Sequence, residues 1–194
     1  MAIAQKLKAF LDAAKVRYTV ARHPVAYTAQ EIAAAQHVPG RQLAKSVLVT
    51  TDRGPVLAVL PAVQLIDLKK LKALLGAKTL TIAKEADIKQ QFPDVEVGAM
   101  SPFGQLDGVP VVLDRQLGEA DEIVFNGGSH TDTVKMRYRD FSALIRAKLG
   151  AFGQAIGGPP ARKKKPRPSR KPPRANAARS TTGSRSRATK KRRR

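Results

Sequence analysis

Two glycine-containing loops and one lysine are the parts of this sequence whose residue types and spacing could do chemistry. Residues 97–104 read VGAMSPFG. Gly98 can adopt a positive φ and lets a backbone N–H approach a ligand, while Pro102 fixes its own φ and stiffens the loop. Such a loop can present backbone donors to an oxygen at a fixed geometry. An ordinary turn is the alternative, because Gly and Pro mark turns in most proteins.

Lys45 is the second candidate because it directly precedes the apolar run 46–49, which reads SVLV. Its aliphatic stem is therefore expected to be partly buried, with the ammonium near the mouth of a pocket. A lysine in that place suits a phosphate or a carbonyl oxygen. The alternative is a lysine at a strand edge in solvent, since most lysines are exposed.

A second polar loop, 126–130, reads NGGSH and follows a predicted strand. Its backbone N–H groups and the imidazole of His130 could line the same pocket as the first loop, although a wide turn with an exposed histidine is an equal alternative. The chain has no cysteine, and its three histidines form no HxxxH pair, so we expect neither a metal nor a cofactor. Ser101 lies in no GxSxG motif and is not proposed as a nucleophile.

Hydrophobic periodicity predicts which elements must position these groups. Thr28 and Glu31 fit a capping box, and Asp114 is assigned to a surface turn. Short strands and helices interleave without a strict βαβ repeat, which favours an α+β class with a mixed sheet or barrel and helices outside. The predicted helices are 2–14, 28–35, 68–75, 84–91 and one from Asp140 to Leu149, and the predicted strands are 17–22, 44–50, 55–60, 79–82, 109–113, 122–125 and 133–137.

Charge divides the chain into two parts. Residues 159–194 hold 16 of the 36 Lys and Arg residues and no acidic residue, which leaves 20 basic and 15 acidic residues before them. We therefore expect a folded domain over 1–150, then a hinge and a disordered Lys/Arg/Pro-rich tail over 151–194. No apolar run approaches the ~20 residues of a membrane span, and no signal peptide is evident. These features fit a cytoplasmic protein without a membrane partner.

Several of these motifs occur in an order that resembles a known family. Lys45 before an apolar strand, GAMSPFG at 98–104, VPVVLD at 109–114 and the glycine pair 127–128 together resemble the YbaK and prolyl-tRNA synthetase-associated editing domains. The resemblance covers about residues 2–149. It implies a mixed β-barrel-like sheet flanked by helices, and hydrolysis of the ester between a wrongly attached amino acid and the 3′ end of tRNA. The basic tail is a departure from the family.

The resemblance also implies roles for particular residues. Lys45 would engage the 3′ end of the substrate, and a loop would position the ester carbonyl and the attacking water. His130 resembles a histidine of the alanine-directed branch, which favours a small amino acid, alanine first. The implied loop residues are Gly98, Ala99, Met100, Ser101 and Pro102, and the expected substrate-binding residues are Tyr27, Thr28, Val47, Gly127, Gly128 and His130, with Tyr27, Thr28, Val47, Met100 and His130 as pocket walls.

The tail suggests a partner by charge alone. Lys and Arg residues in a segment without acidic residues can bind tRNA, or any other polyanion, through phosphates. The alternative functions are a non-catalytic nucleic-acid-binding adaptor that uses this tail, and a regulator that binds a free amino acid or nucleotide. Contact with an aminoacyl-tRNA synthetase is a further option. The tail residues assigned to tRNA are Arg162, Lys163, Lys164, Lys165, Lys190, Lys191, Arg192, Arg193 and Arg194.

Overall fold

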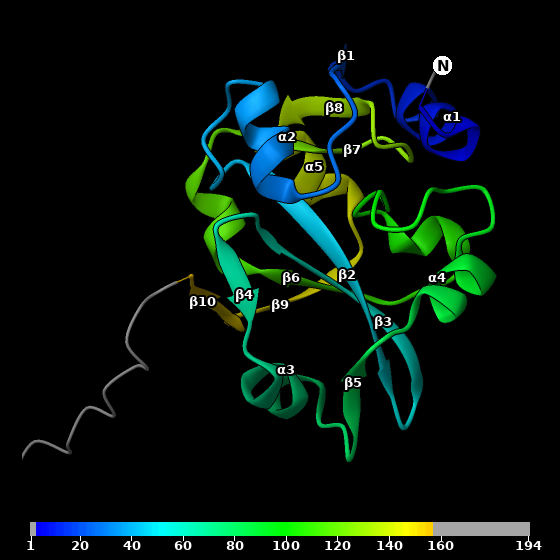
Figure 1. Ribbon diagram of the computed structural model, residues 1–194, viewed down its shortest axis with the longest axis vertical. Coiled ribbons are helices and arrows are strands. Elements are labelled where there is room, and N and C mark those ends of the chain that lie inside the picture. The colour runs from blue at the N-terminus through cyan, green and yellow to red at the C-terminus, as the bar shows by residue number, and fades with distance from the viewer. Residues whose placement is uncertain (1–2, 157–194) are drawn as a thin grey trace, which may run out of the picture. The chain divides into compact units, whose positions relative to one another are not determined.

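The computed structural model of the protein describes residues 3–156, and its centre is a mixed sheet of eight strands (Figure 1). The strand order is β1-β8-β7-β2-β3-β6-β9, and β5 pairs with β2 outside this path. A separate pair joins β4 to β10. The strands are β1 Tyr18–Arg22, β2 Leu43–Thr51, β3 Gly54–Pro61, β4 Gln64–Ile66, β5 Leu80–Ile82, β6 Val111–Asp114, β7 Glu122–Asn126, β8 Asp132–Arg137, β9 Ala147–Gly150 and β10 Gly153–Ala155.

Pairing in the large sheet is both parallel and antiparallel. Strands β2 and β7, β3 and β6, and β6 and β9 run parallel. Strand β2 also runs antiparallel to β3 and to β5, and β8 runs antiparallel to β1 and to β7. The mixed sheet flanked by helices that the sequence predicts is therefore confirmed.

Two of the helices have the boundary signals that the sequence marks. Thr28 and Glu31 form the predicted capping box of α2. Asp67 accepts two backbone N–H groups at the start of α3, and Gly76 ends that helix in the left-handed conformation with φ 63°. The helices are α1 Gln5–Ala13, α2 Ala29–Ala35, α3 Leu68–Leu75, α4 Glu85–Gln91 and α5 Tyr138–Leu144, with 3-10 turns at Gly104–Asp107 and Arg115–Glu119.

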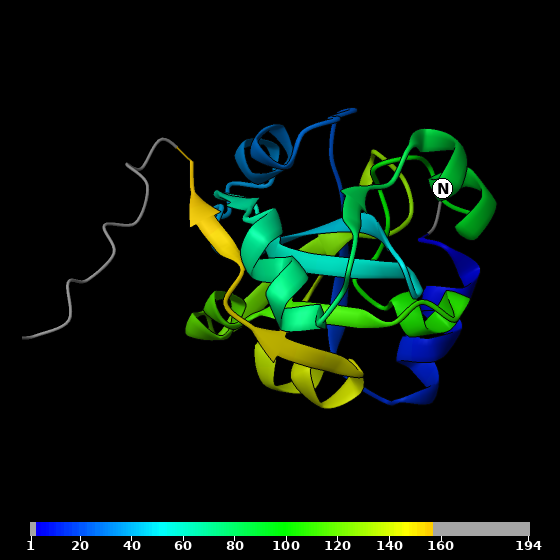
Figure 2. The same ribbon diagram turned by 90° about the horizontal axis from the view of Figure 1, so that it is seen from below.

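An aromatic cluster in the main core anchors the loop that precedes β6. The Phe103 ring is fully buried, and its centroid lies 5.3 Å from that of Phe10, 5.6 Å from Phe125 and 5.4 Å from Phe141. These contacts join α1, β7 and α5, and the view from below shows α1 (blue) and α5 (yellow) beside the sheet (Figure 2). Because Phe103 is fixed from three sides, one end of the 97–104 loop has little freedom.

Two predictions about the C-terminal part of the fold are wrong. The helix predicted to reach Leu149 ends at Leu144, and the next residues form β9, which pairs with β6. Residues Gly153–Ala155 of the predicted hinge form β10, which pairs with β4. In both places pairing with a distant strand outweighs the local pattern. The predicted basic tail lies outside the described residues.

Asp114 was assigned to a surface turn, and this too is wrong. Its side chain is 1% exposed and accepts hydrogen bonds from three backbone N–H groups. The donors are Gln116 at 3.0 Å, Phe152 at 2.8 Å and Gly153 at 2.7 Å. A buried carboxylate needs such partners, and here they fasten the segment before β10 to the end of β6.

Candidate functional site

A gap in the sheet lies beside β2, at the residue that the sequence singles out. The parallel pairing with β7 joins Leu43 to Val124 and Ala44 to Phe125, and then it ends. Pairing on the same edge of β2 resumes only at Val49, with β5. Lys45 and Asn126 are therefore the first residues after β2 and β7 separate. Strands that diverge in this way leave room for a ligand between them.

Backbone groups of β2 point into this gap. The Leu43 carbonyl accepts a hydrogen bond from the N–H of Ala62, directly after β3. Backbone groups alternate in direction along an antiparallel pair, so the N–H and C=O of Ser46 point away from β3. They face the edge at which neither β7 nor β5 is paired.

A small cavity of about 160 Å³ occupies this place. Residues from five parts of the chain meet around it: the segment before α2, α2 itself, β2, the loop at Gly98 and the end of β7 at Asn126. Lys45 contributes the one charged side chain in this lining. The lining residues are Tyr27, Ala29, Ile32, Leu43, Ala44, Lys45, Ser46, Val47, Gly98 and Asn126.

Lys45 is half-buried and its ammonium donates a hydrogen bond to the backbone carbonyl of Gln64 in β4. Burial lowers the pKa of Lys45 below its ordinary value. Within residues 3–156 this side chain has no carboxylate partner. An ammonium carries three N–H donors, so Lys45 can bind a ligand oxygen in the cavity while it holds Gln64.

Gly98 brings the first loop to the cavity. Its φ is 91°, a conformation that favours glycine, so the reason for a glycine here is conformational as the sequence predicts. Among the described residues its N–H has no hydrogen-bond partner. Its carbonyl accepts a hydrogen bond from the amide of Asn126 at 3.4 Å. Gly98 can therefore offer one backbone donor to an oxygen beside Lys45.

The two polar loops come together next to this cavity. Glu96 donates its backbone N–H to Gly128 at 3.0 Å, and its carboxylate accepts the backbone N–H of His130 at 2.6 Å. The His130 Nε2 lies 3.0 Å from the Val97 carbonyl. A carbonyl only accepts, so Nε2 carries the proton, and Nδ1 is buried without a partner among the described residues. His130 thus holds the 97–98 backbone.

The capping box of α2 holds the rim of the cavity. One oxygen of Glu31 accepts the backbone N–H groups of Tyr27 and Thr28, each at 3.0 Å. Hydrogen bonds from Thr28 first, and then from Tyr27, lower the pKa of Glu31. The Tyr27 ring packs on His130 with centroids 4.9 Å apart, although Tyr27 is 73% exposed. Tyr27 therefore forms a supported wall that opens to solvent.

Of the predicted pocket walls, Tyr27 and Val47 line the cavity and the other three do not. Thr28 caps α2, and His130 lies behind Gly98 and Tyr27. Met100 is buried in the main core. The prediction of Met100 as a pocket wall is therefore wrong, because its side chain packs in the core and not in the lining of the cavity.

The structure separates the five implied loop residues, Gly98 to Pro102, into one that reaches the cavity and four that do not. Gly98 is the member of the 98–102 loop that lines it. Ala99 donates its N–H to the Glu96 carbonyl at 2.9 Å, Met100 and Pro102 are buried, and Ser101 lines a different hollow. The loop turns sharply at Gly98, so its later residues face the core and the far side.

The glycine pair Gly127–Gly128, predicted to bind substrate, lies against the N-terminal segment instead. A Cβ on Gly127 would lie 2.5 Å from the Ile3 side chain, and one on Gly128 would lie 2.9 Å from Ala4. Ala4 also donates its N–H to the Gly127 carbonyl at 2.8 Å. Close packing therefore explains these two glycines.

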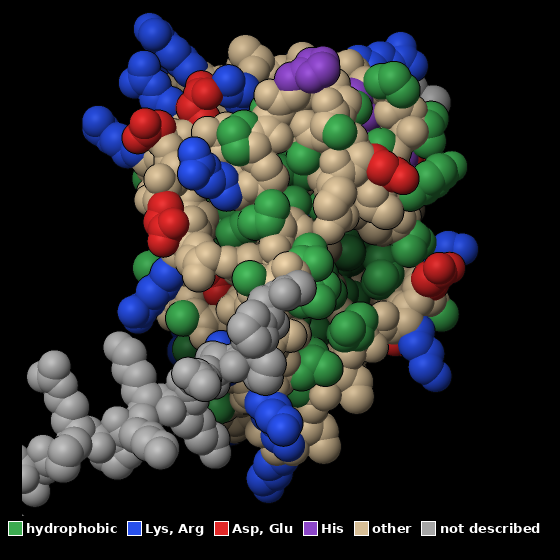
Figure 3. All heavy atoms as spheres, turned by 60° about the vertical axis from the view of Figure 1, so that its left-hand side comes forward, with side chains coloured by type: hydrophobic (Ala, Val, Ile, Leu, Met, Phe, Trp, Pro, Cys, Tyr) green, Lys and Arg blue, Asp and Glu red, His purple; other side chains and the backbone are tan. Residues whose placement is uncertain are grey.

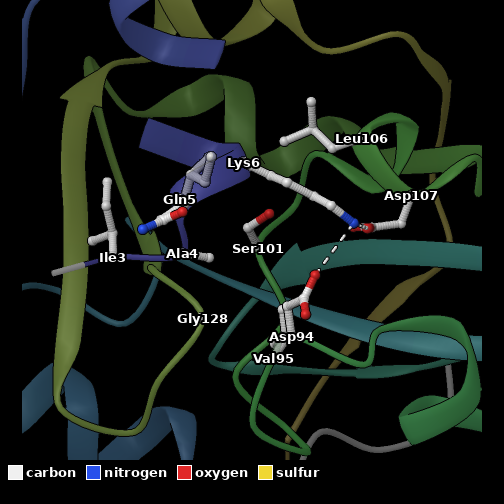
Figure 4. Close-up of a pocket in the computed structure, with 11 residues that line it drawn as sticks. Ile3, Ala4, Gln5, Lys6, Asp94, Val95, Ser101, Leu106, Asp107 and Gly128 are labelled. Carbon is white, nitrogen blue, oxygen red and sulfur yellow. Dashed lines mark hydrogen bonds and ion pairs between the residues drawn. The ribbon is translucent and has the colours of Figure 1, made fainter. Parts of the chain in front are cut away.

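Ser101 borders a larger hollow, of about 490 Å³, between α1 and the 94–107 segment (Figure 4). Its lysine is Lys6, whose ammonium lies 3.0 Å from Asp107 and 3.4 Å from Asp94. Two carboxylates offset this cation, whereas Lys45 keeps its charge available for a ligand. The smaller cavity is therefore the better candidate for chemistry, despite its size.

Two polar lining residues, Ser46 and Asn126, are not among the site residues predicted from the sequence, and neither are the apolar Ala29, Ile32, Leu43 and Ala44. Ser46 directly follows Lys45, and Asn126 directly precedes the glycine pair, so their sequence positions were the available signal. The side-chain oxygens Ser46 Oγ and Asn126 Oδ1 are both buried without a hydrogen-bond partner in the described part of the chain. Buried polar atoms are normally paired, so these two unpaired atoms set this part of the lining apart from the apolar core.

The part of the chain that the structure describes has no cluster of three or more His, Cys, Asp or Glu side chains that could hold a metal ion. Within the same residues, no helix is long and apolar enough to cross a membrane. The cavity itself offers one ammonium, backbone groups and neutral polar side chains.

Comparison with known proteins adds independent findings. The family model described as "Aminoacyl-tRNA editing domain" matches residues 23–144. The prolyl-tRNA editing protein ProX of Acetoanaerobium sticklandii is 29% identical over 154 residues, which cover 76% of this chain and 93% of that protein. A solved structure described provisionally as a trans-editing enzyme for prolyl-tRNA synthetase has a TM-score of 0.69 and 22% identity, over 78% of this chain and 97% of that one.

Larger proteins share the same region. The proline–tRNA ligase of Nitratidesulfovibrio vulgaris is 36% identical over 131 residues, which cover 66% of this chain and 22% of the ligase. The chain thus corresponds to about a fifth of such a ligase.

Proposed function

Because the chain belongs to the aminoacyl-tRNA editing domain family, we propose that it is a trans-editing hydrolase that deacylates mischarged tRNA. The observation that carries this proposal is the cavity that Lys45 and Gly98 border together. The similarity to ProX, which extends over 93% of that protein, supports an enzyme that acts without the rest of a ligase.

The proposed reaction is attack of water on the ester that joins the amino acid to the 3′-terminal ribose. The water oxygen bonds to the carbonyl carbon, and the carbon–oxygen bond to the ribose then breaks. The ribose oxygen takes up a proton, which leaves a free amino acid and a tRNA with its hydroxyl restored. An aminoacyl ester is already reactive, so positioning and charge stabilisation can supply the acceleration.

Two groups of the cavity fit the negative charge that develops on the carbonyl oxygen. The Gly98 N–H has no partner among the described residues, and the Lys45 ammonium has N–H donors to spare. A donor that points at such an oxygen contributes about 10²–10³-fold to a rate. The mechanism requires no side chain as nucleophile, which agrees with a lining that contains no carboxylate, histidine or cysteine.

The size of the cavity supports a small amino acid. Its volume is about 160 Å³, and its inner walls include Ala29, Ile32 and Leu43. One methylene is worth about 1–3 kcal/mol in an apolar pocket, so an apolar wall can separate alanine from larger residues. We propose alanine as the first substrate to test.

A panel of mischarged tRNAs tests this function. The full chain should hydrolyse alanyl-tRNA well above the spontaneous rate, and less of the same tRNA charged with serine, threonine or cysteine. Replacement of Lys45 by alanine should lower the rate at least 100-fold, because it removes the one cation of the cavity. If every member of the panel stays intact at high protein concentration, the proposal is wrong.

A further inference from the structure

Tyr27 differs from the other residues that line the Lys45 cavity, because it is 73% exposed. Gly98 is the other exposed member of that lining, and it has no side chain. Folding normally removes aromatic rings from water, because each ring carries a large apolar area. At the mouth of this cavity, the fold instead leaves most of one ring in solvent.

The Tyr27 ring is held in place although it is exposed. The backbone N–H of Tyr27 donates to Glu31 at 3.0 Å, and that of Ala26 donates to the carbonyl of His130 at 3.2 Å. The ring packs on the imidazole of His130, with an angle of 55° between the two planes. Two hydrogen bonds to residues 96 and 97 fix His130 in turn. A ring with so little freedom loses little entropy when a flat ligand stacks on it.

The cavity is too small to hold an aminoacyl group and a nucleoside together. Its volume is about 160 Å³, whereas pockets that enclose a drug-sized molecule measure about 300–1,000 Å³. In the proposed reaction the ester carbonyl lies beside Lys45 and Gly98, and the terminal base is joined to that ester through one ribose. The base therefore lies outside the cavity, one sugar away from the reacting carbon.

Tyr27 lies close enough to Gly98 to meet a base in that position. A Cβ built on Gly98 would lie 3.6 Å from the imidazole of His130, and the Tyr27 ring packs on the same imidazole with centroids 4.9 Å apart. Gly98 and Tyr27 thus both lie against a single five-membered ring. The ribose is also a five-membered ring, so a base one ribose away from an ester at Gly98 can reach Tyr27.

We propose that the exposed ring of Tyr27 stacks on the base of the 3′-terminal nucleotide of the tRNA. The inference rests on the proposed deacylase function, and it assigns Tyr27 to the nucleotide instead of the amino acid. Stacking on an aromatic ring tolerates any base, because every base has a π-face. Tyr27 thus contributes affinity for the end of the RNA, while the cavity selects the amino acid.

The test uses the full chain and two forms of alanyl-tRNA. In one form the terminal nucleotide carries its adenine, and in the other a hydrogen replaces that base. Single-turnover rates at subsaturating protein measure kcat/KM and are divided by the spontaneous hydrolysis rate of each ester. The variants are Tyr27→Leu, which removes the ring, and Tyr27→Phe, which keeps it. Val25→Ala is the matched control, because Val25 is 60% exposed on the same segment and lies outside the lining.

For the wild type, removal of the base should lower kcat/KM about 5- to 150-fold, the usual contribution of one base stacked on an aromatic ring. Tyr27→Leu should lower kcat/KM for the intact substrate by a similar factor, and removal of the base should then cost less than about threefold more, because the stack is already lost. Tyr27→Phe should remain sensitive to the base. Val25→Ala should stay within about threefold of the wild type on both substrates. Thermal unfolding reports whether each variant folds, and the wild-type comparison needs no variant.

Equal losses for Tyr27→Leu on both substrates would overturn the inference, because Tyr27 would then act on the amino acid or through His130. A wild type that is insensitive to the base would overturn it as well. In both cases alanyl-tRNA is still hydrolysed, so the deacylase function stands. A wild type that hydrolyses neither substrate would contradict the deacylase function, and the inference with it.

Discussion

At the scale of single residues, the site depends on polar groups that the fold leaves without partners. Lys45 and Gly98 each have a hydrogen-bond donor to spare among the described residues, and Asn126 lines the same cavity. The sequence predicted Lys45 and Gly98, because an apolar strand and a glycine–proline loop are local patterns. It did not predict Asn126, whose importance depends on where β7 separates from β2, a property of two strands that are distant in the chain.

Replacement of Lys45 by methionine should separate activity from stability. The half-buried ammonium carries a desolvation cost that methionine avoids, while the hydrogen bond to Gln64 is lost. These effects oppose each other, so the free energy of unfolding should change by less than about 1 kcal/mol. Thermal and urea unfolding measure this, and deacylation should be lost. A strongly destabilised variant would show that Lys45 is mainly structural.

The lowered pKa of Lys45 predicts a pH dependence with a definite sign. Its folded pKa lies below the ordinary 10.5, so the native state loses this proton first as pH rises. The cost of burying the charge is present at neutral pH and is relieved above the folded pKa, so this group makes stability rise with pH there. Substrate binding should weaken over the same range. NMR titration of the Lys45 side chain measures the pKa, and a value at or above 10.5 would contradict this account.

At the scale of elements, sequence patterns predicted most helices and strands but not the pairs that close the fold. Helix α3 has both its signals in the sequence, Asp67 before it and Gly76 after it. Residues 147–150 instead continue a helical pattern, and they form β9 because β6 offers a strand edge. Distant pairing also explains why the sequence does not predict the burial of Asp114, since two of its hydrogen-bond donors lie 38 and 39 residues away.

Asp114 lies away from the site, and its replacement should lower the free energy of unfolding substantially. Replacement by alanine leaves three backbone N–H groups without their acceptor in a buried place, which should cost about 3 kcal/mol. Asp121→Ala is the matched control, because Asp121 is exposed and should change stability by less than about 0.5 kcal/mol. Urea unfolding of both variants provides the comparison, and equal values would contradict the role given to Asp114.

We expect Gly98→Ala to reduce activity by more than its effect on stability explains. Alanine at φ 91° is strained, by about 1–2 kcal/mol, and its Cβ would lie 3.6 Å from the His130 ring at the border of the cavity. Gly108→Ala is the control, with φ 72° and no neighbouring atom within 4 Å of its Cβ. Both variants should unfold at lower temperature, and deacylation should fall sharply for Gly98→Ala alone. Equal activity in the two variants would show that the loop at Gly98 is an ordinary turn without a role in the reaction.

At the scale of the whole molecule, charge is distributed unevenly along the sequence. The face seen in Figure 3 carries Lys, Arg, Asp and Glu side chains interspersed at its edges, with hydrophobic side chains between them. By contrast, 16 of the 36 basic residues fall in 159–194, where no acidic residue occurs. We therefore expect the tail to contribute most of the electrostatic attraction to tRNA phosphates.

Deletion of residues 159–194 tests this expectation and separates two functions. For an editing enzyme, the rate at saturating substrate should persist while KM rises at least tenfold and depends less on salt, because phosphate contacts are lost. For a nucleic-acid-binding adaptor, binding should collapse and no turnover should be seen before or after the deletion. Steady-state kinetics at several salt concentrations distinguish these results. A truncated chain with unchanged KM would contradict the assignment of the tail.

The most direct test of the account compares the two lysines that border the two hollows. Single-turnover hydrolysis of alanyl-tRNA is measured for the wild type, Lys45→Ala and Lys6→Ala, all as full chains. The account predicts that Lys45→Ala reduces the rate at least 100-fold, whereas Lys6→Ala, whose lysine is paired with Asp94 and Asp107, stays within about threefold of the wild type. If Lys45→Ala retains the wild-type rate, or if Lys6→Ala causes the larger loss, the reaction centre does not lie at the Lys45 cavity.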